Sequence, residues 1–138
     1  MFPFFFIKKK NGNLQPVQDY QKLNTFTVQN TAPLPLIQEL MDQLMRVHGC
    51  RSALFTKLNI QWGYNNIHIC DGDQWKAAFK TNCGLFEPMV MFFGLTNAPA
   101  TFQSMMNFIF RKLINEGYVT IYMDDILIHT PNNVTLHR

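Results

Sequence analysis

The longest periodic pattern in the sequence lies between Asn97 and Gly117. Asn97 suits the cap of a helix, and Pro99 suits its first turn. The apolar residues that follow have the three- and four-residue spacing of one helical face: Phe102, Met105, Met106, Ile109, Phe110 and Leu113. The pattern therefore predicts an amphipathic helix that ends at residues 115–117 and buries one face against another element.

Two apolar runs follow this helix, residues 118–123 and 126–130, and two adjacent acids separate them. The runs predict a strand hairpin with Asp124 and Asp125 at its tip. A plain hairpin turn favours glycine or asparagine, and neighbouring carboxylates at such a turn repel each other. A divalent cation would remove this conflict, because Mg²⁺ prefers hard oxygen ligands. A solvated acidic turn without a ligand is the alternative.

The rest of the chain alternates between strand and helix patterns. A helix is expected from Pro35 to about Gly49, and residues 25–32 are expected to form a loop. Because Pro16 cannot donate a backbone hydrogen bond, its strand is expected at a sheet edge or a bulge. The expected strands are 4–10 and 14–20 around a turn at residues 11–13, then 53–60, 66–70 after a bend at 62–64, and 75–81 and 85–92 as a second hairpin. This order predicts an α+β fold with a largely antiparallel sheet.

Composition limits the class of protein further. Hydrophobic residues make up 47% and charged residues 15% of 138 residues, which excludes a disordered chain and suits one domain. The net charge of +3 permits a nucleic-acid partner without arguing for one. Three cysteines at unrelated spacing predict neither a metal site nor a disulfide scaffold, and therefore an intracellular protein, cytoplasmic or nuclear. The longest uncharged apolar run, Phe2–Ile7, is too short to span a bilayer, so no membrane partner is expected.

Six blocks of sequence, in the same order, closely resemble the reverse transcriptases of gypsy-type long-terminal-repeat retrotransposons. The blocks are Val17–Asn24, Pro33–Ile37, Phe55–Asn59, Trp62–Tyr64, Phe93–Gln103 and Tyr122–Ile128. The resemblance implies the fingers and palm of a right-hand polymerase, with an antiparallel palm sheet backed by two helices. Residues 1–50 would contribute fingers elements and a connecting helix. Residues 51–138 would form most of the palm with interleaved fingers segments, and the thumb would be missing.

The resemblance also implies an activity, RNA-directed DNA polymerisation, and the residues that carry it. Two Mg²⁺ ions would drive deoxynucleotidyl transfer, with Asp124 as a principal ligand and Asp125 in support. Tyr64 would sit under the sugar and exclude a 2′-hydroxyl, although an aromatic packed on the sheet is the alternative. Lys9 would contact the γ-phosphate, and Met123 would lie beside the primer terminus. The nucleotide-binding residues implied by the family are Lys9, Gln15, Ile60, Gln61, Trp62, Gly63, Tyr64, Phe93, Gly94 and Met123.

This chain departs from the family pattern at functional positions. Asn59 stands where the family has a metal-binding aspartate, and an amide brings no charge to a site for two divalent ions. Gln15 replaces an arginine that holds nucleotide phosphates, and Gln21 replaces another arginine. These changes and the missing thumb predict a chain that is inactive in isolation. The alternatives are a non-catalytic retroelement remnant and a repurposed module that binds nucleic acid or protein.

The family also implies the partners of this chain. They are an RNA or DNA template with its primer and the incoming deoxynucleotide, and in the family the enzyme works inside a virus-like particle. The remainder of a Pol polyprotein is expected to be missing.

Overall fold

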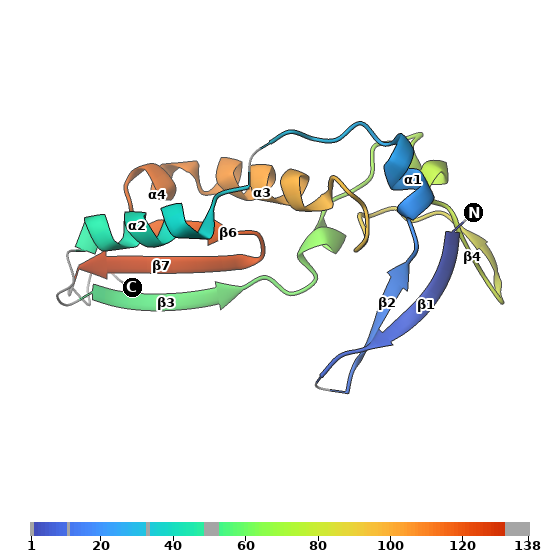
Figure 1. The fold of residues 1–138 in the computed structure, drawn as a ribbon, viewed down its shortest axis with the longest axis horizontal. Coiled ribbons are helices and arrows are strands. Elements are labelled where there is room, and N and C mark those ends of the chain that lie inside the picture. Colours follow the sequence, from blue (N-terminus) through green and yellow to red (C-terminus); the bar gives the residue numbers. More distant parts are fainter. Residues whose placement is uncertain (1, 11, 33, 49–52, 132–138) are drawn as a thin grey trace. The chain divides into compact units, whose positions relative to one another are not determined.

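The computed structural model describes residues 2–10, 12–32, 34–48 and 53–131 of the chain. In chain order the elements are β1 (Phe2–Lys8), β2 (Leu14–Gln18), α1 (Gln21–Phe26), α2 (Ile37–His48), β3 (Ala53–Asn59), the short 3₁₀ helices η1 (Gly63–Asn66) and η2 (Gln74–Ala77), β4 (Phe79–Thr81), β5 (Gly84–Phe86), α3 (Ala98–Ile109), α4 (Arg111–Asn115), β6 (Val119–Tyr122) and β7 (Asp125–Pro131) (Figure 1). The expected α+β class is confirmed. Within the described ranges, no helix is both long and apolar enough to cross a membrane.

The chain divides into two compact units. Residues 1–30 and 62–98 make the first unit, and residues 31–61 and 99–138 make the second. Each unit therefore combines two segments that are far apart in the sequence.

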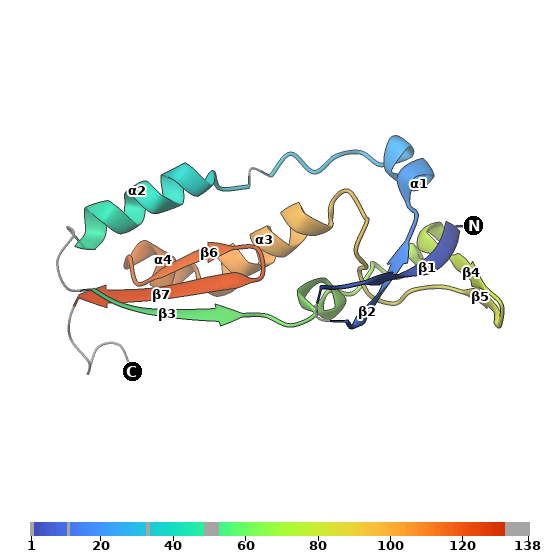
Figure 2. The same cartoon turned by 60° about the horizontal axis from the view of Figure 1, so that its bottom comes forward.

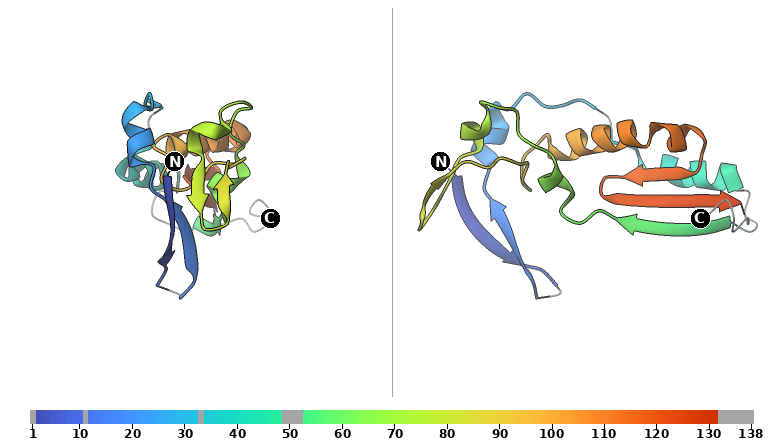
Figure 3. Two further views of the ribbon diagram at one scale, coloured as in Figure 1. Left: turned by 90° about the vertical axis from the view of Figure 1, so that its right-hand side faces the viewer. Right: turned by 180° about the vertical axis from the view of Figure 1, so that it is seen from behind.

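The first unit is built on a sheet with the strand order β2-β1-β4-β5. Strands β1 and β2 form a long antiparallel hairpin, in which Pro16 pairs with Phe6 (Figure 3). Because β2 is an edge strand of this sheet, the expectation for Pro16 is confirmed. Tyr20 is 1% exposed and donates its hydroxyl hydrogen bond to the carbonyl oxygen of Ala77 at 3.1 Å. Burial raises the pKa of the Tyr20 phenol.

Gln18, on β2, is a buried polar residue that weakens the first unit. Its side chain is 2% exposed, and neither its amide nitrogen nor its amide oxygen has a hydrogen-bond partner in the described part of the chain. A buried polar group without a partner costs about 1–3 kcal/mol of folding free energy. Valine at this strand position would remove the unsatisfied amide and would suit an extended backbone.

We therefore expect Gln18→Val to raise the free energy of unfolding of the first unit by about 1–2 kcal/mol. Tryptophan fluorescence during urea denaturation measures this directly, because Trp62 and Trp75 both belong to this unit. The control is Gln18→Glu, which places a carboxylate at the same buried position and should lower the stability. A Gln18→Val chain that is less stable than the wild type would contradict the prediction.

The second unit is built on an antiparallel sheet with the order β3-β7-β6. Figure 2 shows β7 between β3 and β6, with α2, α3 and α4 running alongside this sheet. The register pairs Asn59 of β3 with Asp125 of β7, and Asp125 with Tyr122 of β6. The buried apolar side chains of this unit come from α3 and from the two hairpin strands: Ala100, Phe102, Met106, Val119, Ile121 and Ile126.

The structure corrects the expected elements in several places. The helix expected from 97 to 115 is interrupted at Phe110, whose φ of −96° and ψ of 10° separate α3 from α4. The stretch 21–26 is helical, although no helix was expected there. The strand expected at 66–70 is wrong, because only an isolated bridge joins His68 to Val90. The strands expected at 75–81 and 85–92 are shorter, β4 and β5, because residues 74–77 form η2. The Lys76 ammonium of η2 makes an ion pair with Asp73.

The errors in the strands share a physical cause. β-Propensity reflects the packing that a residue finds in the fold rather than an intrinsic backbone preference. Short apolar runs such as Asn66–Cys70 therefore do not determine their own pairing. The expected turn residue Asn11, the residue Pro33 and the expected helix end at Gly49 lie outside the described residues.

Candidate functional site

The acidic pair stands at the tip of the β6–β7 hairpin, as expected. Tyr122 and Asp125 are paired, so Met123 and Asp124 alone form the turn. The φ angle of Met123 is +52°, a left-handed conformation that a non-glycine residue rarely adopts. A residue held in this way costs of order 1–3 kcal/mol and persists only where its surroundings impose it.

The side chain of Gln103, on α3, stabilises the left-handed conformation of Met123. Its side chain is 2% exposed, and its Oε1 accepts a hydrogen bond from the Met123 N–H at 2.7 Å. Its Nε2 donates to the Ile121 carbonyl oxygen at 3.2 Å and to Asn107 Oδ1 at 2.9 Å. Gln103 is not among the site residues expected from the sequence. The sequence does contain a sign of its burial, because Gln103 is a polar residue three positions before Met106, on the apolar face of the helix.

Asn59 lies directly beside the acidic pair. Its Nδ2 donates a hydrogen bond to Asp125 Oδ1 at 2.8 Å and makes a long contact of 3.4 Å with Asp124 Oδ2. The backbone N–H of Ile60 donates to the Asp124 carbonyl oxygen at 2.8 Å, which ties the end of β3 to the turn. The structure therefore brings together positions 59, 124 and 125, and Met123, Ile60 and Gln61 adjoin them in the chain.

Lys57 is a fourth member of this cluster, and it is not among the site residues expected from the sequence. Its Nζ lies 2.9 Å from Asp125 Oδ2, and the two side chains are 63% and 41% exposed. The Lys57 ammonium and, after it, the Asn59 amide hold the pKa of the Asp125 carboxyl below its ordinary value. Both oxygens of Asp125 therefore already have a donor.

This donor set does not fit a pair of divalent ions. The cluster offers two carboxylates, an amide whose NH₂ faces those carboxylates, and an ammonium, so its formal charge is −1. Two divalent ions carry four positive charges and need anionic oxygen ligands on both. Among the described residues, no three His, Cys, Asp or Glu side chains form a group suited to one metal ion.

Four expected nucleotide-binding residues form aromatic contacts in the first unit. The Lys9 ammonium lies 5.8 Å from the ring centroid of Trp62, a cation–π contact. Trp62 itself has a φ of +57° and precedes the buried Gly63. Tyr64 contacts Phe93 edge-to-face, with ring centroids 4.9 Å apart.

Another expected residue of this unit, Gln15, is half-buried on β2 and pairs with Ile7.

The loop before α3 is fixed to α1 by Asn24, a residue with no expected role at the site. Asn24 Nδ2 donates to the Gly94 carbonyl oxygen at 2.8 Å, and Asn24 Oδ1 accepts from the Thr96 N–H at 3.0 Å. Gly94 has a φ of +99°, and a Cβ there would lie 3.1 Å from the Gln18 carbonyl oxygen, so only glycine fits. Asn97, expected as a helix cap, directly precedes α3, and its side chain bonds the backbone of Val28 and Asn30.

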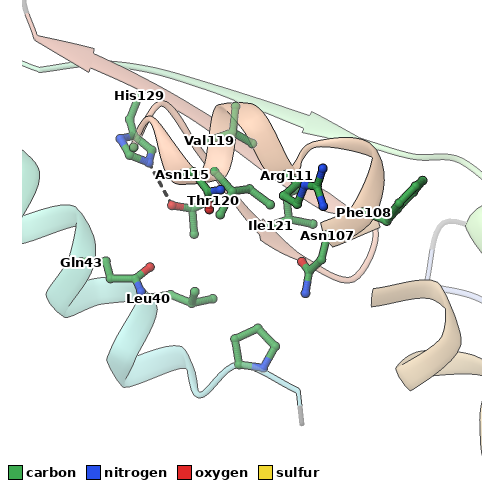
Figure 4. Close-up of a pocket in the computed structure, with 13 residues that line it drawn as sticks. Leu40, Gln43, Asn107, Phe108, Arg111, Asn115, Val119, Thr120, Ile121 and His129 are labelled. Atoms are coloured by element: carbon green, nitrogen blue, oxygen red, sulfur yellow. Dashed lines mark hydrogen bonds between the residues drawn. The ribbon is translucent and has the colours of Figure 1, made fainter. Parts of the chain in front are cut away.

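Described residues of the second unit line a cavity and a smaller groove. A cavity of about 720 Å³ separates Leu40 and Gln43 of α2 from the side chains of α3, α4 and β6 (Figure 4). Thr120 and His129, which share a hydrogen bond of 2.9 Å, line its wall. None of the expected site residues lines it. A smaller apolar groove of about 270 Å³ lies between α2 and the strands, and both Lys57 and Asp125 line this groove.

Comparisons with known proteins agree on one family. Residues 7–138 match the family described as reverse transcriptase (RNA-dependent DNA polymerase). The Tf2-3 and Tf2-7 transposon polyproteins of Schizosaccharomyces pombe are 43% and 42% identical to this chain over 128 residues, which are 93% of the chain. The chain spans 9% of the length of these polyproteins.

Solved structures of foamy viral protease-reverse transcriptase share the fold. The complex with an RNA/DNA hybrid matches with a TM-score of 0.80 at 20% identity, over 99% of this chain and 17% of the viral chain. The complex with double-stranded DNA matches with a TM-score of 0.82 at 19% identity, over 99% of this chain and 27% of the viral chain. The expected fingers and palm architecture is thereby confirmed.

Proposed function

Because this chain belongs to the reverse transcriptase family, we propose that it is the fingers and palm region of an RNA-directed DNA polymerase whose chemistry is impaired at Asn59. The first unit corresponds to the fingers and the second to the palm in this proposal. A gypsy-type long-terminal-repeat retrotransposon is the proposed source, on the strength of the six sequence blocks and the identity with the Tf2 polyproteins.

One observation supports impairment above all. The side chain of Asn59 donates to Asp125 at 2.8 Å, where the family has a third carboxylate that would accept a cation. An amide that donates to the acidic pair adds no negative charge and keeps the two carboxylates engaged with protein groups. Two-ion phosphoryl transfer needs the ions to neutralise the developing charge, so this substitution removes transition-state stabilisation.

The proposed ligands follow from the family. They are a primer with an RNA or DNA template and a deoxynucleotide. The residues proposed to bind the nucleotide include Lys9, Tyr64 and Phe93 of the first unit. The positions that hold Mg²⁺ in the family correspond to Asp124 and Asp125, with Asn59 as the degenerate third position, and the proposed location is intracellular.

The experiment that tests this proposal is primer extension in a longer chain. A chimera carries residues 7–138 of this chain in place of the matching segment of the Tf2-3 polyprotein, so that the rest of the polymerase is present. We expect the chimera to extend a DNA primer on an RNA template at least about a hundredfold more slowly than the same chimera with Asn59→Asp, in Mg²⁺ or Mn²⁺.

A matched control makes the same chemical change elsewhere. Asn82→Asp adds a carboxylate at an exposed loop position of the first unit and should leave extension unchanged. Rapid extension by the chimera that retains Asn59 would overturn the proposed impairment. Absence of extension in the Asn59→Asp chimera would show that a second defect, such as Gln15, also blocks the reaction.

A further inference from the structure

Lys57 and Asn59 reach the same carboxylate from neighbouring positions of one strand. They are two residues apart on β3, so their side chains leave the same face of the sheet. Asn59 pairs with Asp125 in the strand register, and Lys57 pairs with Leu127. Lys57 therefore reaches Asp125 diagonally across the sheet, and this placement follows from the β3–β7 pairing rather than from a chance surface contact.

The contacts make the acidic tip asymmetric. Asp125 Oδ2 receives the Lys57 ammonium at 2.9 Å, and Asp125 Oδ1 receives the Asn59 amide at 2.8 Å. Within the ranges that the structure describes, the Asp124 carboxylate makes a single side-chain contact, at 3.4 Å with Asn59, and Asp124 is exposed. A cation that approached both acids would find the Asp124 carboxylate exposed to solvent. The Asp125 carboxylate, in contrast, is already paired with the Lys57 ammonium.

We propose that Lys57 is a built-in counter-cation of Asp125, which competes with divalent cations for the acidic tip and weakens their binding. This inference rests on the proposed function only in taking Asp124 and Asp125 as the cation site of the family. It assigns a role to a residue outside the acid and amide positions of that site.

The strength of the competition follows from Coulomb's law. Repulsion between a divalent ion and an ammonium about 4 Å away, even at the dielectric constant of bulk water, lowers an equilibrium constant by roughly thirtyfold. Salt screens exposed charges, and both side chains are partly exposed, so we expect about a tenfold effect at low ionic strength.

The test is Mn²⁺ binding to the 138-residue chain, with free Mn²⁺ measured by electron paramagnetic resonance at low ionic strength. Lys57→Met removes the charge and keeps an apolar stem beside Met41 and Leu44, which line the same groove. We expect Lys57→Met to bind Mn²⁺ about tenfold more tightly than the wild type, and Lys57→Arg to bind as the wild type does. Circular dichroism of each variant verifies that it is folded.

Two further variants locate the effect. Lys112→Met removes an exposed positive charge from α4 and should leave Mn²⁺ affinity unchanged. Adding Asp125→Asn to Lys57→Met should abolish the gain. The proposal is overturned by a Lys57→Met affinity within twofold of the wild type, by an equal gain in Lys112→Met, or by a gain that survives Asp125→Asn.

This measurement is independent of polymerase activity. A chimera that extends primers with Asn59 in place would overturn the proposed impairment, yet it would leave the Mn²⁺ result standing. Equal Mn²⁺ affinities would overturn the role of Lys57 and leave the family assignment untouched.

Discussion

Phe102→Ala is expected to destabilise the second unit by about 3–5 kcal/mol, the largest effect of any single substitution considered for this chain. Phe102 is 1% exposed on α3 and lies in the core that supports the β6–β7 hairpin. Truncation to alanine removes a buried ring and leaves a cavity that the surrounding side chains fill only in part. Whole domains have only about 5–15 kcal/mol of stability, so this loss would unfold a large fraction of the molecules.

Urea denaturation followed by far-ultraviolet circular dichroism measures this loss. Phe108 provides a matched control, because it lies on the same helix and is 76% exposed. Phe108→Ala should change the free energy of unfolding by no more than about 0.5 kcal/mol. Tryptophan fluorescence adds a second control, since both tryptophans belong to the first unit. Equal losses for the two phenylalanines would contradict the assignment of the core.

Gln103→Leu is expected to destabilise the same unit by about 2–3 kcal/mol and to loosen the turn that carries Asp124. Leucine keeps the apolar contacts, but it leaves the Met123 N–H and the Ile121 carbonyl oxygen without the partner that Gln103 provides. An unsatisfied buried polar group costs about 1–3 kcal/mol. The left-handed backbone of Met123 would also lose the hydrogen bond that Gln103 accepts from it.

Hydrogen exchange distinguishes this positioning role from a general loss of stability. In Gln103→Leu, the Met123 amide should exchange faster, relative to core amides of β7, than in the wild type. Asn107→Ala removes only the exposed end of the same network, and it should cost less than about 1 kcal/mol with little change at Met123. Uniformly faster exchange across the sheet would argue that Gln103 is an ordinary core residue.

In the second unit, the β6–β7 hairpin and the buried Gln103 that bonds its turn form the support of the acidic tip. At this tip only position 59 departs from the family pattern, because Lys57 lies within the matching block Phe55–Asn59. Position 59 contributes an amide, and Lys57 contributes a cation, so the tip of the hairpin is partly neutralised by the protein itself.

Much of this could be predicted from the sequence. The periodic face of Phe102–Leu113 predicts a helix, two apolar runs around adjacent acids predict a hairpin, and the ordered blocks predict the family. Such features depend on residues close together in the chain, and local spacing is enough to reveal them. The break at Phe110 and the failed strand at 66–70 depend on packing that spacing does not contain.

Only the tertiary structure decided which groups meet at the acidic tip. Lys57 reaches Asp125, 68 positions away, because β3 and β7 pair in one particular register, and Gln103 reaches Met123 because α3 lies under the turn. Contacts of this kind depend on distances between elements that are remote in the chain. The sequence by itself therefore determined the family, the acids and the amide at position 59. The fold determined the partners of each carboxylate, and with them the charge that a cation would meet.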